Sequence, residues 1–142
     1  MSFELKKRER DGIPIVELHG RFVMGEPMES FRSMFETLAA EGHRSAVLDM
    51  RDVDYIDSSA LGSLVYAHTR AEKSGGKIAM FGLAARHLEL MVLTKLSTVF
   101  PLFEEEVDAV NSCIPGRETR KFDILEFIER QRQDAREGQA RE

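Results

Sequence analysis

The chain of 142 residues contains one cysteine, no tryptophan and only four prolines. A single cysteine, Cys113, excludes an internal disulfide and a cysteine-rich metal site. No apolar run approaches the roughly 20 residues that cross a bilayer, and the N-terminal segment carries charges where a signal peptide needs an apolar stretch. We therefore expect a cytoplasmic protein without membrane insertion, with the length of one domain plus a short appendage.

Sequence motifs for catalysis and for nucleotide binding are also missing. The chain has no Gly-x-x-x-x-Gly-Lys phosphate loop, no Gly-x-Gly-x-x-Gly segment and no Gly-x-Ser-x-Gly nucleophile elbow. The histidines are scattered, and their spacing to one another and to Cys113 is unlike that of metal ligands; they are His19, His43, His68 and His87. We expect no metal, no other cofactor and no enzymatic activity.

The charge is negative overall and unevenly distributed. The net charge is −5, whereas a general nucleic-acid binder would normally be basic, so we expect no nucleic-acid partner. Residues 117–142 hold seven basic and seven acidic residues, which leaves the whole deficit in residues 1–116. Because Pro115-Gly116 separates these parts, we predict a domain over 1–116 and a charged extension over 117–142.

The first half of the domain predicts a hairpin, a helix and a buried strand. Residues 3–9 and 13–18 are extended-type segments on either side of Asp11-Gly12, and Pro14 belongs at a strand start or on an edge. A helix begins at Glu26-Pro27 and ends at Gly42. Residues 46–50 form a nearly continuous apolar run, as expected of a strand covered on both faces.

The second half continues the alternation of helices and strands. We predict a helix from residue 57 to Gly75-Gly76, with His68 on its flank, a buried strand over 77–81 and a helix over 84–94. A short strand over 99–103 is expected at an edge because Pro101 interrupts it, and a helix over 104–113 follows. Helical crossovers favour parallel strands, so the fold class is α/β, with a mixed four- to five-stranded sheet and helices packed against it.

One segment at the start of the second helix combines capping residues with small residues. Asp57, Ser58 and Ser59 are all good N-cap residues, and something must cap this helix. One cap suffices, however, and Ala60 and Gly62 follow directly, although glycine inside a helix costs about 1 kcal/mol relative to alanine. Small residues leave the first turn uncovered, so that another protein can approach it.

The string Asp57-Ser58-Ser59-Ala60-Leu61-Gly62, after the strand over 47–50, resembles the signature of the STAS domain of bacterial anti-sigma factor antagonists. The element order over residues 3 to about 113 is similar to that fold, which has helices on one side of the sheet. The resemblance implies that Ser58 is the phosphoacceptor, Asp57 its acidic neighbour and Ser59 the helix cap. It further implies a surface that binds the partner, comprising Asp57, Ser59, Ala60, Leu61, Gly62, Val23 and Glu26.

The chain departs from the family pattern at two places. Ala60 stands where the family often has glycine, which keeps the site small. Antagonists commonly carry an acidic residue near the third position after the glycine that corresponds to Gly20, whereas this chain has Val23 there; Glu26 is the nearest acidic substitute. This second departure concerns the identity of the kinase partner more than the fold.

The resemblance implies partner switching. The unmodified protein would bind an anti-sigma factor that is also a serine kinase, phosphorylation of Ser58 would release it, and a serine phosphatase would reverse the modification. The alternative is a scaffold or accessory subunit of a sensory or transport assembly that does not depend on Ser58.

The extension contains a short apolar cluster. At helical spacing Phe122, Leu125 and Ile128 share one side, while Glu126 and Arg130 pair at i,i+4 on the solvent side. We expect a helix to about residue 134, followed by disorder. Two arrangements are open: the helix packs on its own domain, or it docks on another subunit, as in a homodimer formed through the extension.

Overall fold

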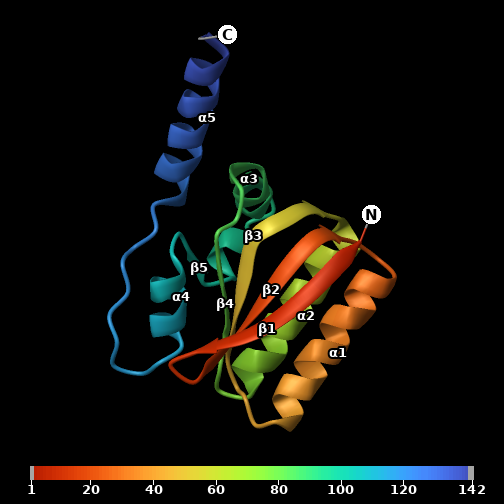
Figure 1. The fold of residues 1–142 in the computed structure, drawn as a ribbon. Coiled ribbons are helices and arrows are strands. Elements are labelled where there is room, and N and C mark those ends of the chain that lie inside the picture. The colour runs from red at the N-terminus through yellow and green to blue at the C-terminus, as the bar shows by residue number, and fades with distance from the viewer. Residues whose placement is uncertain (1, 141–142) are drawn as a thin grey trace.

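The computed structural model describes residues 2–140 and contains a five-stranded sheet in the order β1-β2-β3-β4-β5 (Figure 1). Strand β1 is antiparallel to β2, and the remaining neighbours are parallel, so the expected mixed sheet is confirmed. The strands are Phe3–Arg10 (β1), Ile13–Phe22 (β2), Ala46–Ile56 (β3), Ile78–Phe81 (β4) and Leu102–Phe103 (β5).

The helices alternate with the parallel strands, as the apolar spacing predicted. They are Glu26–Ala40 (α1), Ser58–Lys73 (α2), Ala85–Leu93 (α3), Glu106–Ser112 (α4) and Ile124–Ala140 (α5), with a short 3-10 helix over Leu96–Thr98 that was not expected. Among residues 2–140, no helix combines the length and the apolar character needed to span a membrane.

Helices cover both faces of the sheet, which corrects the expectation of helices on one side. Val16, Leu48 and Met80 belong to the large core shared with α1, α2 and α3. The alternate positions, Ile15, Val47, Ala79 and Phe81, form a second core with Ala109 and Val110 of α4. Successive strand residues point to opposite faces, so these nearly continuous apolar runs require a cover on each side.

Strand β3 continues well beyond the apolar run that predicted it. Its second half pairs with the end of β2, with Val53 opposite Gly20 and Ile56 opposite Phe22. In this half Val53 and Ile56 are buried while Asp52, Asp54 and Tyr55 are exposed. Strict alternation is broken at Asp54 and Tyr55, where the pairing with β2 shifts register between Gly20 and Arg21. Strand β3 ends at Ile56, directly before Asp57.

Helix α5 packs its first turns on its own domain and then projects away from it (Figure 1). Ile128 is buried, Phe122, Ile124 and Phe127 are half-buried, and Arg132 pairs with Glu89 of α3. Asp123 caps the helix, since its Oδ1 accepts from the Glu126 N–H at 3.1 Å, and the predicted Glu126–Arg130 pair is present at 3.3 Å.

Two expectations about the extension are wrong. Leu125 is 66% exposed, because the helix starts only after Asp123 and its buried side is therefore Ile124, Phe127 and Ile128 rather than the side that carries Leu125. The residues from 135 to 140, expected to be disordered, continue α5. Residues 141 and 142 lie outside the described part of the chain.

Candidate partner-binding site at the start of helix α2

Asp57 caps helix α2 and also holds the preceding loop. Its Oδ1 accepts from the Ala60 N–H at 2.8 Å, and its Oδ2 accepts from the Met24 N–H at 3.0 Å. The main-chain N–H of Asp57 donates to the Phe22 carbonyl at 3.2 Å. These bonds bring together the two segments that the resemblance singled out, the loop after β2 and the start of α2.

The expectation that Ser59 caps the helix is therefore wrong. Asp57 has the extended backbone of an N-cap, with φ −87° and ψ 172°, because β3 runs up to Ile56 and α2 begins at Ser58. The hydrogen bonds from the N–H groups of Ala60, Met24 and Ser59 lower the pKa of the Asp57 carboxyl. Asp57 is consequently ionised at neutral pH.

Ser58 is the first residue of α2 and its side chain is exposed. Because Asp57 supplies the cap, the Ser58 hydroxyl has no structural task, and it forms no side-chain hydrogen bond with any residue from 2 to 140. Ser59, one position later, is half-buried. The two adjacent serines thus differ in how open they are to another protein.

The remaining expected partner residues divide into buried and exposed ones. Ala60 is fully buried and Leu61 is 8% exposed, so neither offers its side chain to a partner, and these two assignments are corrected. Gly62 is exposed, and a Cβ atom added there would meet nothing within 4 Å. Gly62 therefore leaves open space on the first turns of α2.

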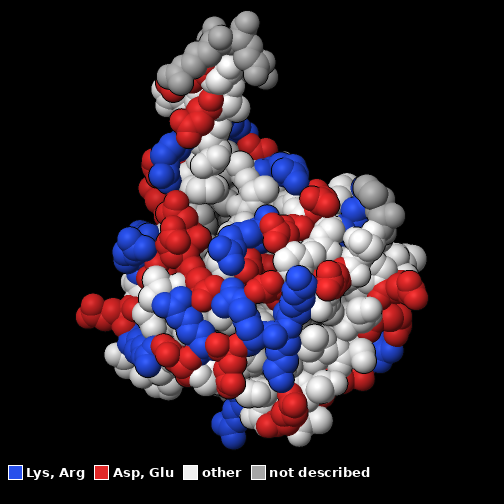
Figure 2. Space-filling model, in the orientation of Figure 1, with Lys and Arg blue, Asp and Glu red and all other residues white. Residues whose placement is uncertain are grey.

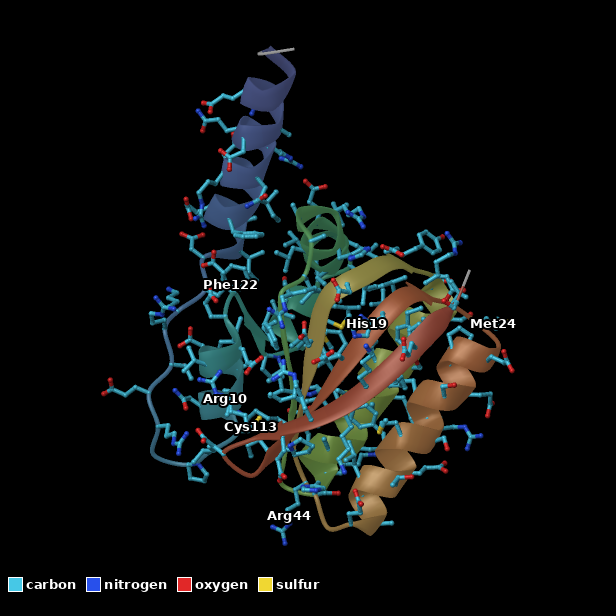
Figure 3. The ribbon with its side chains drawn as sticks, viewed as in Figure 1. Arg10, His19, Met24, Arg44, Cys113 and Phe122 are labelled. Carbon is cyan, nitrogen blue, oxygen red and sulfur yellow. The ribbon has the colours of Figure 1, made fainter. Side chains whose placement is uncertain are left out.

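The loop between β2 and α1 lies beside Ser58 and contributes an apolar side chain that the sequence did not reveal. Met24 is 67% exposed and lies at the end of the molecule where α1 begins (Figure 3). Val23 is half-buried, while Glu26, the first residue of α1, is exposed. A methionine in a loop gives no pattern in the sequence, and only the bond to Asp57 shows where it lies.

A second exposed group comes from the end of β3. Tyr55 is 45% exposed, and the Arg21 guanidinium lies 4.7 Å from its ring centroid, a cation–π distance. Arg86 of α3 donates to the Asp54 carbonyl at 2.9 Å. Tyr55 is thus exposed two residues before Asp57. Strict alternation along β3 would put Tyr55 on the same face as the buried Val53, so no pattern in the sequence identified it.

The face of the molecule that carries β1 is covered by charges of both signs (Figure 2). Arg8 there contacts Glu17, Asp49 and Glu106. Burial opposes ionisation of Asp49, but hydrogen bonds from Arg51 and Arg8 outweigh it and lower the pKa of this carboxyl. These charges are paired with one another, so this face is a structural network rather than a binding site of one sign.

The histidines do not form a ligand set. His68, expected on the flank of α2, is instead buried, with its ring edge against Phe100 and its Nδ1 accepting from the Ile78 N–H at 3.4 Å. Among residues 2–140 no group of three or more His, Cys, Asp or Glu side chains is arranged to hold a metal ion.

Known proteins resemble this chain in sequence. A STAS-domain containing protein of Pseudomonas aeruginosa is 34% identical over 89 residues, which cover 63% of this chain and 83% of that protein. The anti-sigma-B factor antagonist of Listeria monocytogenes is 27% identical over 106 residues, covering 72% of this chain and 88% of the relative.

Solved structures share the fold at lower identity. An anti-sigma factor antagonist from Mycobacterium paratuberculosis superimposes with a TM-score of 0.67 at 18% identity, covering 79% of this chain and 94% of that one. The Bacillus cell fate determinant SpoIIAA in its phosphorylated form gives a TM-score of 0.59 at 16% identity, and the match covers 78% of this chain and 98% of SpoIIAA. The sequence model of the STAS domain family matches residues 4–109, and the chain therefore belongs to the STAS domain family.

Proposed function

We propose that this protein is an anti-sigma factor antagonist that acts by partner switching. In the unmodified state it binds an anti-sigma factor with serine kinase activity through the start of α2 and the adjoining loop. Phosphorylation of Ser58 releases the partner, and a serine phosphatase restores binding. The observation that carries this proposal is the exposed Ser58 at the first position of α2, whose hydroxyl is left free because Asp57 makes the cap.

The first turn of α2 suits a phosphate group without a change of fold. Main-chain N–H groups at a helix N-terminus point toward an anion there, and the helix dipole favours negative charge by about 0.3–1 kcal/mol. Ser58 is exposed, so the phosphate remains hydrated. Modification therefore acts on the surface and leaves the packed core as it is.

Release follows from the charge that the phosphate adds. A phosphoserine carries about −1.5 to −2 charges at pH 7, and it would stand next to the ionised Asp57. A partner seated on Met24 and Gly62 would have to desolvate both anions, which removes several kcal/mol of binding free energy. A few kcal/mol corresponds to a hundredfold or greater loss of affinity.

The relatives support the same assignment. The Listeria relative is named an anti-sigma-B factor antagonist, and SpoIIAA, which shares the fold, has been solved in a phosphorylated form. At Val23 the chain lacks the acidic residue that antagonists commonly have, so we assign this loop, together with Met24, to the choice of kinase rather than to the switch itself.

Phosphate mapping tests the proposal. The purified protein is incubated with ATP and extract of its own host, and the modified residue is identified by mass spectrometry in the wild type, Ser58→Ala and Ser59→Ala. We expect one phosphate, lost in Ser58→Ala and retained in Ser59→Ala, the matched control one residue away. Phosphate on Ser59, or its retention in Ser58→Ala, would overturn the assignment of Ser58.

A further inference from the structure

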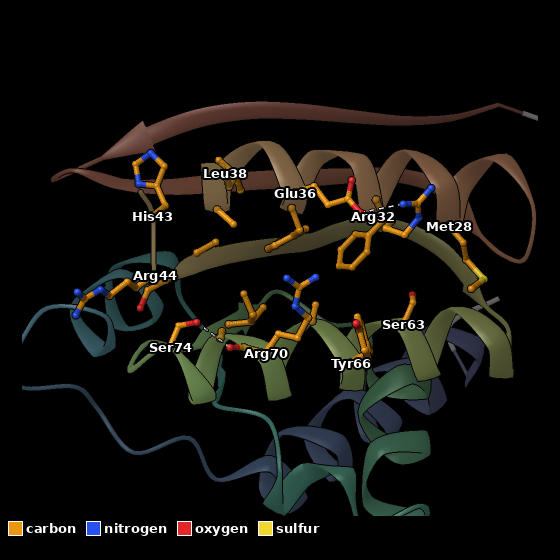
Figure 4. Close-up of a pocket in the computed structure, with 18 of the residues that line it drawn as sticks. Met28, Arg32, Glu36, Leu38, His43, Arg44, Ser63, Tyr66, Arg70 and Ser74 are labelled. Carbon is orange, nitrogen blue, oxygen red and sulfur yellow. Dashed lines mark hydrogen bonds and ion pairs between the residues drawn. The ribbon is translucent and has the colours of Figure 1, made fainter. Parts of the chain in front are cut away.

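A groove of about 210 Å³ runs between α1 and α2 (Figure 4). Its floor is apolar and includes Phe31, Leu38 and Ile78, all nearly fully buried. Small side chains border the groove at Ser63, Ala67 and Ala71 of α2 and at Ser74, directly after the helix, alongside the longer Tyr66 and Arg70. The small side chains are too short to fill the space toward α1.

Most polar groups in the groove already have partners. Ser63 Oγ donates to the Ala60 carbonyl at 2.7 Å, and Ser74 Oγ donates to the Arg70 carbonyl at 3.2 Å. On the α1 side, Arg32 pairs with both Glu29 and Glu36. Both carboxylates thus have a partner, although one guanidinium between two carboxylates leaves a net charge of −1 on the α1 side.

Arg70 of α2 has no such partner. Its exposed guanidinium lies 5.7 Å from the centroid of the Tyr66 ring and forms no ion pair with any residue from 2 to 140. Figure 4 shows Arg70 projecting from α2 toward α1, across the groove. Arg44, which also lines the groove, likewise forms no ion pair among residues 2–140. The groove thus combines an apolar floor with two unpaired cations, of which Arg70 is the one that points across it.

We propose that this groove binds a medium-chain fatty acid. The alkyl chain would lie on the floor between α1 and α2, and the carboxylate would accept hydrogen bonds from the Arg70 guanidinium, which matches carboxylate geometry in a two-pronged fashion. The volume is below the roughly 300–1,000 Å³ of sites for drug-sized ligands, which favours a single short chain. The inference does not depend on the proposed function, because the groove uses α2 from Ser63 onward and not Ser58.

Calorimetric titration with decanoate tests the charge complementarity. We expect wild type to bind decanoate, and Arg70→Gln to bind it about tenfold or more weakly, since it loses a charged hydrogen-bond donor. Lys73→Gln is the matched control: it removes the same charge from the same helix outside the groove and should leave affinity unchanged. Equal affinity of wild type and Arg70→Gln, or no binding of decanoate by wild type, would overturn the proposal.

Two further measurements test how the carboxylate and the apolar floor of the groove each contribute to binding. Decanol, which has the same chain without the carboxylate, should bind wild type about tenfold or more weakly than decanoate. Ala67→Leu should abolish binding by filling the groove, with its fold checked by thermal melting. Binding of decanol as tight as that of decanoate, or decanoate binding retained by a folded Ala67→Leu, would contradict the site.

Discussion

At the scale of the residue, Asp57 links the fold to the proposed switch. Three neighbouring residues could cap α2, and their chemistry alone did not distinguish Asp57 from Ser59. The choice depends on where β3 ends, because the cap must have an extended backbone. The length of β3 is set by its pairing with β2, a tertiary contact that the local sequence does not encode.

Asp57→Ala is expected to lower the free energy of unfolding by about 1 kcal/mol, the usual loss for a helix cap. Because the pKa of Asp57 is lower in the folded state, this stabilisation is complete above the unfolded pKa of about 3.9 and disappears as the pH falls through the lower folded value. Urea unfolding of wild type and Asp57→Ala at pH 7 and at pH 2.5 measures the loss of stability and its dependence on pH. Ser59→Ala is the control, and a Ser59 effect as large as that of Asp57 would contradict the cap.

Gly62→Ala separates stability from binding. Because a Cβ atom at this position meets nothing within 4 Å and alanine is the better helix former, the substitution should stabilise the protein by up to about 1 kcal/mol. The same methyl group would intrude on the surface that we assign to the partner, so partner affinity should fall. Thermal melting and a binding titration measure the two effects, and an unchanged affinity would place Gly62 outside the interface.

At the scale of the element, helix α5 was foreseen but its orientation was not. The Glu126–Arg130 pair and the apolar cluster predicted a helix, and both are present. Its buried side could not be read correctly because Phe122 was counted as helical, whereas Asp123 starts the helix after it. A shift of the start changes which residues face α3, since successive residues lie about 100° apart around the axis.

Ile128→Ala should weaken the docking of α5 by about 2–3 kcal/mol, within the range for truncating a buried isoleucine. The helix can detach while the sheet stays folded, so the substitution should lower the free energy of local opening of α5 rather than that of global unfolding. Hydrogen exchange of the α5 amides should accelerate in Ile128→Ala and remain unchanged in Leu125→Ala, where the side chain is exposed. Equal acceleration in both variants would contradict the orientation of α5.

At the scale of the whole molecule, the sheet was predictable and the cover of its second face was not. Apolar runs and alternating helices determine a mixed sheet, and Pro101 correctly indicated that β5 is an edge strand. The position of α4 on the sheet could not be predicted, because it depends on contacts between distant parts of the chain. One example is the hydrogen bond from Arg8 of β1 to Glu106 of α4, which lie 98 residues apart in the sequence. The motif at Asp57–Gly62 is the part of the candidate site that the sequence predicted, whereas only the fold brings Met24 beside Asp57.

Phosphorylation should leave the molecule as a whole unchanged. Ser58 is exposed at a helix N-terminus, a position that favours an anion, so the phosphorylated protein should have the circular dichroism spectrum of the unmodified one. Its melting temperature should differ by no more than a few degrees, because about 1 kcal/mol shifts the melting of a domain of this size by that amount. A large loss of helix or a collapse in melting temperature would mean that the switch works by unfolding.

The most direct test of partner switching is retention of a kinase-type anti-sigma factor from host extract by immobilised protein. Wild type and Ser58→Ala should retain it, and Ser58→Asp should lose it. Ser59→Asp, which adds the same charge one residue away at a half-buried position, should retain more of the partner than Ser58→Asp does. Retention of the same proteins by wild type, Ser58→Ala and Ser58→Asp would contradict the account and leave Ser58 as an ordinary surface residue of the first helical turn.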